Sequence, residues 1–173
     1  MRHPPGRPKG EYRSAQHEGC QMSAVLAAPA PGAARDGTPA AARSAAFAAL
    51  VNAFRASGGT ARGDDLARLL EDHQQGDFVS LARLIASGHV FGFDWRGVLW
   101  IPMFQYDLRT LSIRPGPHQV LAELAGAFEG WALASWFAQP NAWLGDRKPV
   151  DLLDSDLAGV LQAARADRFI AAG

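Results

Sequence analysis

The sequence is poor in cysteine, and this scarcity excludes two kinds of structure. Its one cysteine among 173 residues is Cys20, so a single chain can form neither an internal disulfide nor a zinc site built on several cysteines. A protein without disulfides fits a reducing compartment. We therefore expect a cytoplasmic protein whose fold depends on its apolar core.

Long apolar runs and an excess of charge of either sign are also missing. No stretch of about 18 apolar residues occurs, so the sequence predicts no membrane-spanning helix. The N-terminus lacks the apolar segment of a signal peptide. Lysine and arginine together number 17, as do aspartate and glutamate. The net charge therefore gives no indication of a nucleic acid or an anionic membrane as the partner.

Patterns typical of catalysis and metal binding are absent as well. The five histidines are His3, His17, His73, His89 and His118. No two of them are three or four residues apart, as two metal ligands on one helix would be, and no serine lies in a Gly-x-Ser-x-Gly motif. We expect a protein that is not an enzyme and that holds neither a metal nor a cofactor.

The first 42 residues differ from the rest in composition. Six of the 11 prolines lie there, and large apolar side chains are scarce. Such a segment buries too little surface to offset the entropy lost on ordering, so we expect a disordered tail over residues 1–42. Five basic residues against three acidic ones leave open a weak basic arm that touches nucleic acid, although a solvated tail is the simpler interpretation.

Residues 43–112 are predicted to form helices followed by a β-hairpin. Apolar residues recur there at helical spacing, and the stretch HVFGFDWRGVLWIP is rich in the β-branched and aromatic residues of strands. The predicted elements are helices over 42–56, 64–72 and 78–87, and strands over 90–95 and 98–101. We expect a tight turn at Arg96–Gly97, with Asp64 or Asp65 capping the second helix.

The order helix, turn, helix, hairpin is that of a winged helix-turn-helix. In that arrangement Ser80 and Arg83 would face a major groove, and Arg96 at the hairpin tip would contact phosphate. Residues 43–112 carry seven arginines and seven acidic residues, so little counterion release would favour binding to DNA. We favour the alternative, in which this module docks onto the C-terminal helices.

Residues 113–173 are predicted to be entirely helical. One long helix over 118–139 is apolar around most of its circumference, which is typical of a helix buried against several others. A last helix begins near residue 156, and we expect Asp154 or Ser155 to cap it.

Between these helices lies the stretch FAQPNAWLGDRKPVDLLDSD, residues 137–156, which we call the corner. Asn141 can cap a single helical turn that Gly145 ends, and Pro149 suits the first turn of a short helix. Two leucines then fix that short helix to the core. A corner that served only to reverse the chain would rarely combine all of these features.

The corner resembles part of the C-terminal toxin-binding domain of the Xre/MbcA/ParS antitoxin family. The matching positions are Trp136, Asn141, Leu144, Gly145, Pro149, Leu152 and Leu153. The resemblance covers about residues 113–173, roughly a third of the chain. The hairpin-bearing segment before it differs from the five-helix DNA-binding domain that is usual in this family.

The resemblance implies a helical domain that binds and neutralises a RES-type toxin, an enzyme that destroys NAD. It also implies that the operon is regulated through an N-terminal DNA-binding domain. The residues predicted to bind the partner lie in the corner and the last helix. They are Asn141, Leu144, Gly145, Asp146, Arg147, Lys148, Pro149, Arg165, Arg168 and Phe169.

We therefore expect a mainly α protein, a helical bundle with one central β-hairpin in a winged-helix-like segment. Its predicted parts are a disordered tail over 1–42, a helix-helix-hairpin module over 43–112 and a toxin-binding-like domain over 113–173. An antitoxin-type interaction module with a cognate toxin as its partner is the first expectation for function. A DNA-binding regulator is the alternative, and the oligomeric state, including a homo-oligomer, is open.

Overall fold

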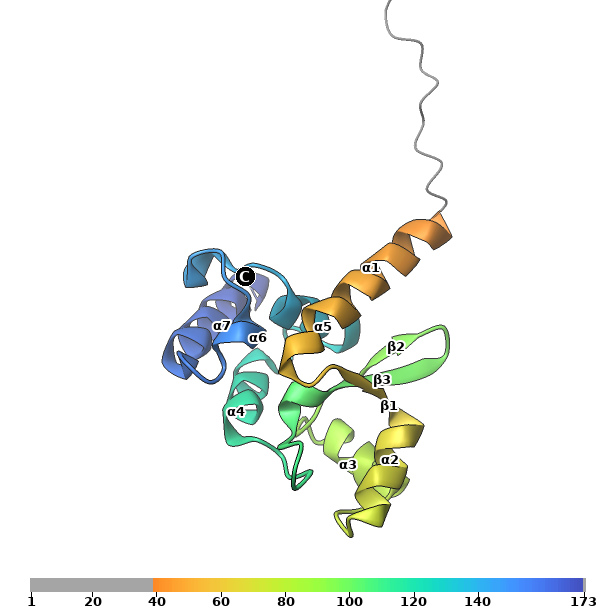
Figure 1. Ribbon diagram of the computed structural model, residues 1–173. Coiled ribbons are helices and arrows are strands. Elements are labelled where there is room, and N and C mark those ends of the chain that lie inside the picture. The colour runs from red at the N-terminus through yellow and green to blue at the C-terminus, as the bar shows by residue number, and fades with distance from the viewer. Residues whose placement is uncertain (1–38, 173) are drawn as a thin grey trace, which may run out of the picture. The chain divides into compact units, whose positions relative to one another are not determined.

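The computed structural model describes residues 39–172, so the predicted disorder of residues 1–38 lies outside the described part (Figure 1). This part is mainly helical with one small antiparallel sheet, as predicted. The helices are α1 (Pro39–Ala53), α2 (Gly63–Asp72), α3 (Phe78–Ala86), α4 (Pro115–Leu124), α5 (Gly130–Ala138), α6 (Pro149–Leu152) and α7 (Leu157–Ala172). Single 3-10 turns are η1 (Arg55–Ser57), η2 (Met103–Gln105) and η3 (Ala142–Leu144), and the strands are β1 (Thr60–Arg62), β2 (Phe93–Trp95) and β3 (Val98–Pro102).

Helix α1 begins earlier than predicted, at Pro39. The predicted tail over 1–42 therefore extends too far by four residues. Proline is well suited to the first turn of a helix, because its missing N–H would have no helical partner there. The alanines that follow it are the best helix formers, so they extend the helix ahead of its apolar stripe.

The sheet contains the predicted hairpin and one strand that the prediction missed. Strand β3 is central, and it pairs antiparallel with β2 on one side and with β1 on the other. Arg96 and Gly97 join β2 to β3 with φ angles of 54° and 75°, as a tight hairpin turn of type I′ requires. This confirms the predicted turn. Strand β1 has only three residues in a glycine-rich segment, so the sequence gives no strand signal there.

Strand β2 is shorter than the predicted strand over 90–95. The residues before it do not pair with β3, because the side chain of Gln105 takes both backbone groups of Phe91. Oε1 of Gln105 accepts from the Phe91 N–H at 2.7 Å, and Nε2 donates to the Phe91 carbonyl at 2.9 Å. The strand therefore begins only at Phe93.

The predicted caps of two helices are wrong. Arg62 precedes α2 without a side-chain hydrogen bond, and Asp64 and Asp65 lie in the first turn, where a carboxylate favours the helix dipole without capping the helix. Helix α7 is capped by Asp156, whose Oδ1 accepts from the N–H of Gly159 at 3.0 Å. Asp154, one of the two predicted caps, forms a salt bridge with Arg114 instead.

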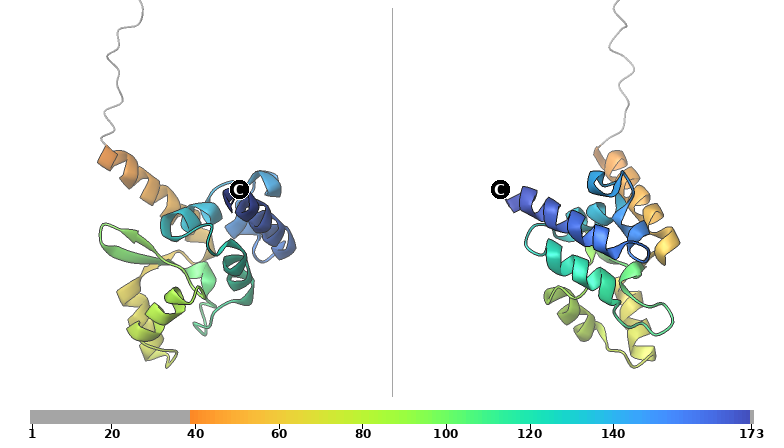
Figure 2. Two further views of the ribbon diagram at one scale, coloured as in Figure 1. Left: turned by 180° about the vertical axis from the view of Figure 1, so that it is seen from behind. Right: turned by 90° about the vertical axis from the view of Figure 1, so that its left-hand side faces the viewer.

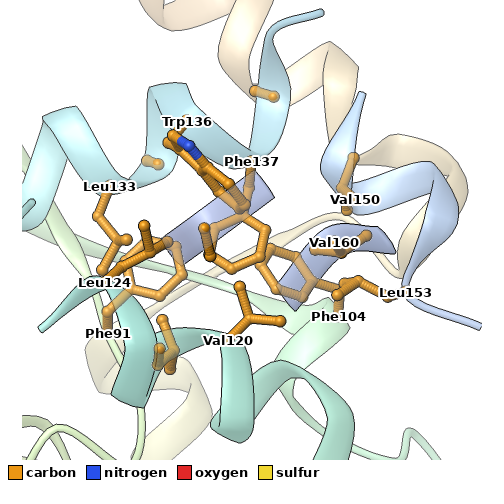
Figure 3. Packing of buried hydrophobic residues seen from close by; sticks show 14 of the residues in the cluster. Phe91, Phe104, Val120, Leu124, Leu133, Trp136, Phe137, Val150, Leu153 and Val160 are labelled. Atoms are coloured by element: carbon orange, nitrogen blue, oxygen red, sulfur yellow. The ribbon is translucent and has the colours of Figure 1, made fainter. Parts of the chain in front are cut away.

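The predicted long helix over 118–139 is also wrong, because the chain breaks into α4 and α5. Gly126 and Gly130 lie on either side of the break with positive φ angles of 79° and 48°, a conformation that glycine adopts without steric cost. The break turns the apolar faces of both helices toward one core. Leu124 at the end of α4 and Leu133 in α5 both lie in it (Figure 3).

The core shows how the two predicted modules combine. One cluster of buried residues, the first core cluster, includes Phe54, Phe91, Phe104, Val120, Phe137 and Val160. These residues come from both sides of the predicted boundary between residues 112 and 113 (Figure 3). A second core cluster, which includes Leu66, Leu81, Ile101 and Tyr106, fills the space between the sheet and helices α2 and α3. The boundary therefore does not separate two cores.

The arrangement of α2, α3 and the hairpin fits the winged-helix-like segment. Helices α2 and α3 pack against the face of the sheet that carries Ile101, and α1 packs against the other face through Phe47 and Trp100. In Figures 1 and 2, α2 and α3 lie at the lower end of the views, away from α7. None of the helices within residues 39–172 is long and apolar enough to cross a membrane.

Candidate partner-binding site

The corner folds locally as its residues predict. The side-chain oxygen of Asn141 accepts from the N–H of Trp143 at 2.9 Å and caps η3. Gly145 ends this turn in the left-handed region. A short antiparallel bridge then pairs Asn141 with Arg147, and Pro149 begins α6. The predicted cap, stop and helix start are therefore confirmed.

Asp167 of α7 anchors the corner to the last helix. Its Oδ2 accepts from Nδ2 of Asn141 at 2.7 Å and from Nε1 of Trp136 at 2.8 Å. Its Oδ1 accepts from Nε1 of Trp143 at 3.1 Å. Asn141 thus caps η3 with its oxygen while its nitrogen binds α7. One carboxylate joins α5, η3 and α7, and it explains why asparagine and tryptophan occupy these corner positions.

The predicted partner-binding residues of the corner divide into two groups. Leu144 and Pro149 are buried, so they serve the fold. Asp146 and Arg147 are exposed at the outer edge, and Lys148 is half-buried beside them. One hydrogen bond restrains the side chain of Arg147, whose Nε donates to the carbonyl of Leu144 at 3.2 Å. The charged edge of the corner is therefore available to a partner, whereas Leu144 and Pro149 are not.

Arg165 and Arg168, the predicted partner-binding arginines of α7, both bind Glu123 of α4. Arg165 approaches Glu123 to 2.8 Å and Arg168 approaches it to 3.4 Å. The hydrogen bond from Arg165 is the main cause that lowers the pKa of Glu123, and the positive charges of both arginines add to it. The two guanidinium groups therefore lie on the α4 side of α7, whereas Asp167 lies on the side of the corner.

This cluster gives a prediction about pH. Because the folded pKa of Glu123 is depressed, the stability it contributes is present above the ordinary glutamate pKa of about 4.3 and is lost as the pH falls through the lower folded value. We expect Glu123→Gln to lower the melting temperature slightly at pH 7. The difference from the wild type should shrink in melting curves recorded at progressively lower pH.

Glu71→Gln is the matched control for this prediction. Glu71 is an exposed residue of α2 and forms no salt bridge among the residues that the structure describes. Its substitution should leave the melting temperature nearly unchanged at every pH. A Glu123→Gln difference that stayed constant down to pH 3 would contradict the role of the ionised carboxylate.

Three large apolar side chains are exposed on the corner and on the helix that Asp167 joins to it. They are Trp143, Phe169 and Ile170, whose exposed fractions are 62%, 81% and 66%. Trp143 lies on η3, and the other two lie near the end of α7. Large apolar side chains with this exposure on neighbouring elements commonly mark an interaction surface. We call these three residues the apolar patch.

A groove of about 830 Å³ runs between η3 and α7. Trp143 and Arg147 line it on the side of the corner, and Gln162 and Ala166 line it on the side of α7. Ile170 is four residues beyond Ala166 and so continues the same face of the helix. The groove and Ile170 therefore lie along one face of α7, and Arg147 and Asp156 place charged groups in the lining of the groove.

The residues predicted to contact DNA do not form one free basic surface. Ser80 is half-buried, and both its hydroxyl and its backbone N–H donate to the capping carboxylate of Asp77. Arg96 donates to the hydroxyl of Ser44 on α1 at 3.2 Å, and its guanidinium lies 5.3 Å from the ring of Trp95. Arg83 is exposed on α3. The hairpin tip is therefore held against α1.

Two members of the apolar patch, Trp143 and Ile170, are missing from the predicted site. The sequence predicts Trp143 only as part of a capped turn, and no pattern in it indicates that the indole ring lies outside the core. The adjacent pair Phe169–Ile170 near the end of the helix was the one signal of exposure. Two consecutive residues point in different directions on a helix, so a single buried stripe cannot cover both. Phe169 is a predicted residue, and it is 81% exposed.

No family model, curated protein or solved structure that was compared with this chain matches it. The resemblance of the corner to the Xre/MbcA/ParS domain stays a prediction that rests on the residues of the corner themselves. The geometry of the site therefore has to be interpreted from its own contacts.

Proposed function

We propose that this protein is an antitoxin-type interaction module that binds a partner protein through the apolar patch and the groove beside it. The observation that carries the proposal is the exposure of Trp143 on η3 and of Phe169 and Ile170 near the end of α7, the helix to which Asp167 anchors Trp143. Three such side chains expose apolar area that a partner would remove from water at about 25 cal/mol per Å².

The surroundings of the patch support a protein as the partner. Interfaces typically have an apolar centre with aromatic anchors and a polar rim that contains arginine. Here Arg147 lies on the rim of the groove, and Arg165 and Arg168 carry exposed guanidinium groups on the neighbouring face of α7. Asp167 holds Trp143 in place before binding, so less side-chain entropy is lost when a partner binds.

The resemblance of the corner supplies the kind of partner. In the Xre/MbcA/ParS family the corresponding domain binds a RES-type toxin that destroys NAD, so we propose a cognate toxin of this type. NAD is consumed in the cytoplasm, and we place the interaction there. The DNA-binding alternative stays a prediction, since Ser80 and Arg96 are occupied by contacts within the chain.

The test is a calorimetric titration of the full chain into the product of an adjacent RES-type gene. We expect Phe169→Glu to weaken binding about 30-fold, the factor that corresponds to about 2 kcal/mol for a truncated interface anchor. Arg147→Ala should weaken binding less, because a residue on the rim is partly solvated in the complex. Neither change should lower the melting temperature, since both side chains are exposed.

Leu108→Glu is the matched control, because Leu108 is also an exposed large apolar residue but lies outside the site. It should bind as the wild type does. Unchanged binding by Phe169→Glu would refute the site while leaving the partner intact. A genome without any RES-type gene would refute the partner.

A further inference from the structure

A second exposed apolar surface lies on α3, far from the apolar patch. Phe78 and Val79 at the start of this helix are 57% and 51% exposed, and Ala82 and Ala86 follow on the same side. Arg83 is the one charged residue within α3. The helix that would read DNA in a winged helix therefore presents an apolar knob, Phe78, followed by a smooth alanine surface.

A pocket lies at the other end of the same helix. It has a volume of about 420 Å³, begins at Ile85 and Ala86 of α3, and reaches Phe128 and Leu133 beyond the break between α4 and α5. Its walls are mainly apolar, and it is large enough for a phenyl ring. A smaller apolar groove of about 280 Å³ runs along α3 from Phe78 to Ala86 and joins the knob to this pocket.

We propose that a second copy of this chain docks on this surface, with the two α3 helices antiparallel across a two-fold axis. Phe78 and Ala86 are eight residues apart, so the knob and the pocket are separated by about 12 Å along the helix. An antiparallel pair brings Phe78 of each copy over Ala86 of the other, at the mouth of the pocket. Ala82 of one copy then meets Ala82 of the other, where a small side chain lets the helices approach closely. A two-fold contact of this kind must be self-complementary, and a knob and a pocket at opposite ends of one helix meet this condition.

Charge and area indicate how strong the contact is. Asp77 carries a pKa lowered by the hydrogen bonds from the Ser80 backbone and hydroxyl, so it stays ionised at neutral pH. The antiparallel arrangement places this carboxylate toward the half of the other α3 that carries Arg83. One nine-residue helix from each copy buries less than the roughly 800 Å² per partner of a stable interface. We therefore expect a weak, reversible dimer rather than a permanent one.

This dimer competes with any contact between α3 and DNA. The recognition helix of a winged helix enters the major groove, and the same helix is covered when two copies meet through α3. The chain can therefore use α3 either to bind duplex DNA as a monomer, with Arg83 in contact, or to form the dimer. The two states exclude each other.

The test is sedimentation equilibrium of the full chain over a range of micromolar concentrations. The wild type is expected to show a reversible monomer–dimer equilibrium. Phe78→Glu removes the knob and should weaken association about 30-fold, as the loss of an interface anchor does. Ala86→Glu places a charge at the mouth of the pocket and should have a similar effect. Both residues are exposed, so melting curves should show folded proteins.

Phe169→Glu is the matched control, since it removes an equally large exposed apolar side chain from a different surface. It should dimerise as the wild type does, and Phe78→Glu should still bind the partner of the apolar patch. A wild-type chain that stays monomeric throughout the range would overturn the proposal. A dimer that Phe78→Glu and Ala86→Glu both leave intact would overturn it too. The proposal would also be overturned if the monomer bound duplex DNA at low salt and the Arg83→Ala variant lost this binding.

Discussion

Replacing Gln105 by leucine is expected to lower the free energy of unfolding by about 3 kcal/mol, because it leaves buried backbone groups without partners. Gln105 is 1% exposed, and its amide makes three hydrogen bonds to backbone atoms. Two of them take the N–H and the carbonyl of Phe91, and the third takes the carbonyl of Pro102. Leucine fills a similar volume, so the loss comes from polar groups rather than from a cavity. Urea unfolding curves of the two proteins give the difference.

Gln105→Glu separates hydrogen bonding from packing. A glutamate carboxylate can accept from the Phe91 N–H but faces two carbonyl oxygens, to which it can donate only when it is protonated. Its folded pKa should therefore lie above the ordinary value of about 4.3, so stability should fall as the pH rises from that value toward the folded pKa. Gln162→Ala on the exposed face of α7 is the control and should change stability by less than about 0.5 kcal/mol. A Gln105→Leu protein as stable as the wild type would contradict the role of the amide.

Replacing Asp167 by alanine is expected to cost about 2 kcal/mol of unfolding free energy. The change removes a charged acceptor that binds Trp136, Asn141 and Trp143, and a hydrogen bond to a charged group contributes about 1.5–3 kcal/mol when it is sheltered. We discount the sum, since Asp167 is only half-buried and the Trp143 bond is exposed. Urea unfolding again measures the difference, with Gln162→Ala as the control on the same helix.

The same substitution should also loosen the apolar patch. Without Asp167 the indole of Trp143 loses its anchor, so binding of the partner should weaken even at temperatures where the variant is fully folded. Trp143→Phe keeps an aromatic ring but gives up one exposed hydrogen bond, and it should cost less than about 1 kcal/mol. Equal stability of the Asp167→Ala variant and the wild type would show that the corner is held by packing alone.

Local signals in the sequence predict those parts of the fold that depend on a few neighbouring residues. The turn at Arg96–Gly97 and the start of α6 at Pro149 follow from backbone preferences that act within two or three residues. The cap of η3 by Asn141 belongs to the same class. These features are correct in the prediction because no distant contact competes with them.

Features that depend on distant residues could not be predicted. The break between α4 and α5 interrupts an apolar pattern that is continuous in the sequence. Only packing in the shared core makes two short helices more stable than one long helix. Strand β1 forms because its backbone can hydrogen-bond to the edge of β3. The conformational preferences of its three residues alone would not make it extended. Asp167 lies 26 residues from Asn141, so its hydrogen bonds to the corner could not be predicted from neighbouring residues.

The first core cluster also limits how this chain could have been assembled. Phe54 and Phe91 pack in the same cluster as Val120 and Phe137, so each half of the chain supplies side chains that the other half keeps from water. Neither half could be exchanged for a domain of another protein unless the residues that it contributes to this cluster were also replaced. A new function is therefore most easily acquired on surfaces outside this cluster, such as the outward faces of α3 and α7, where a substitution leaves the shared interior unchanged.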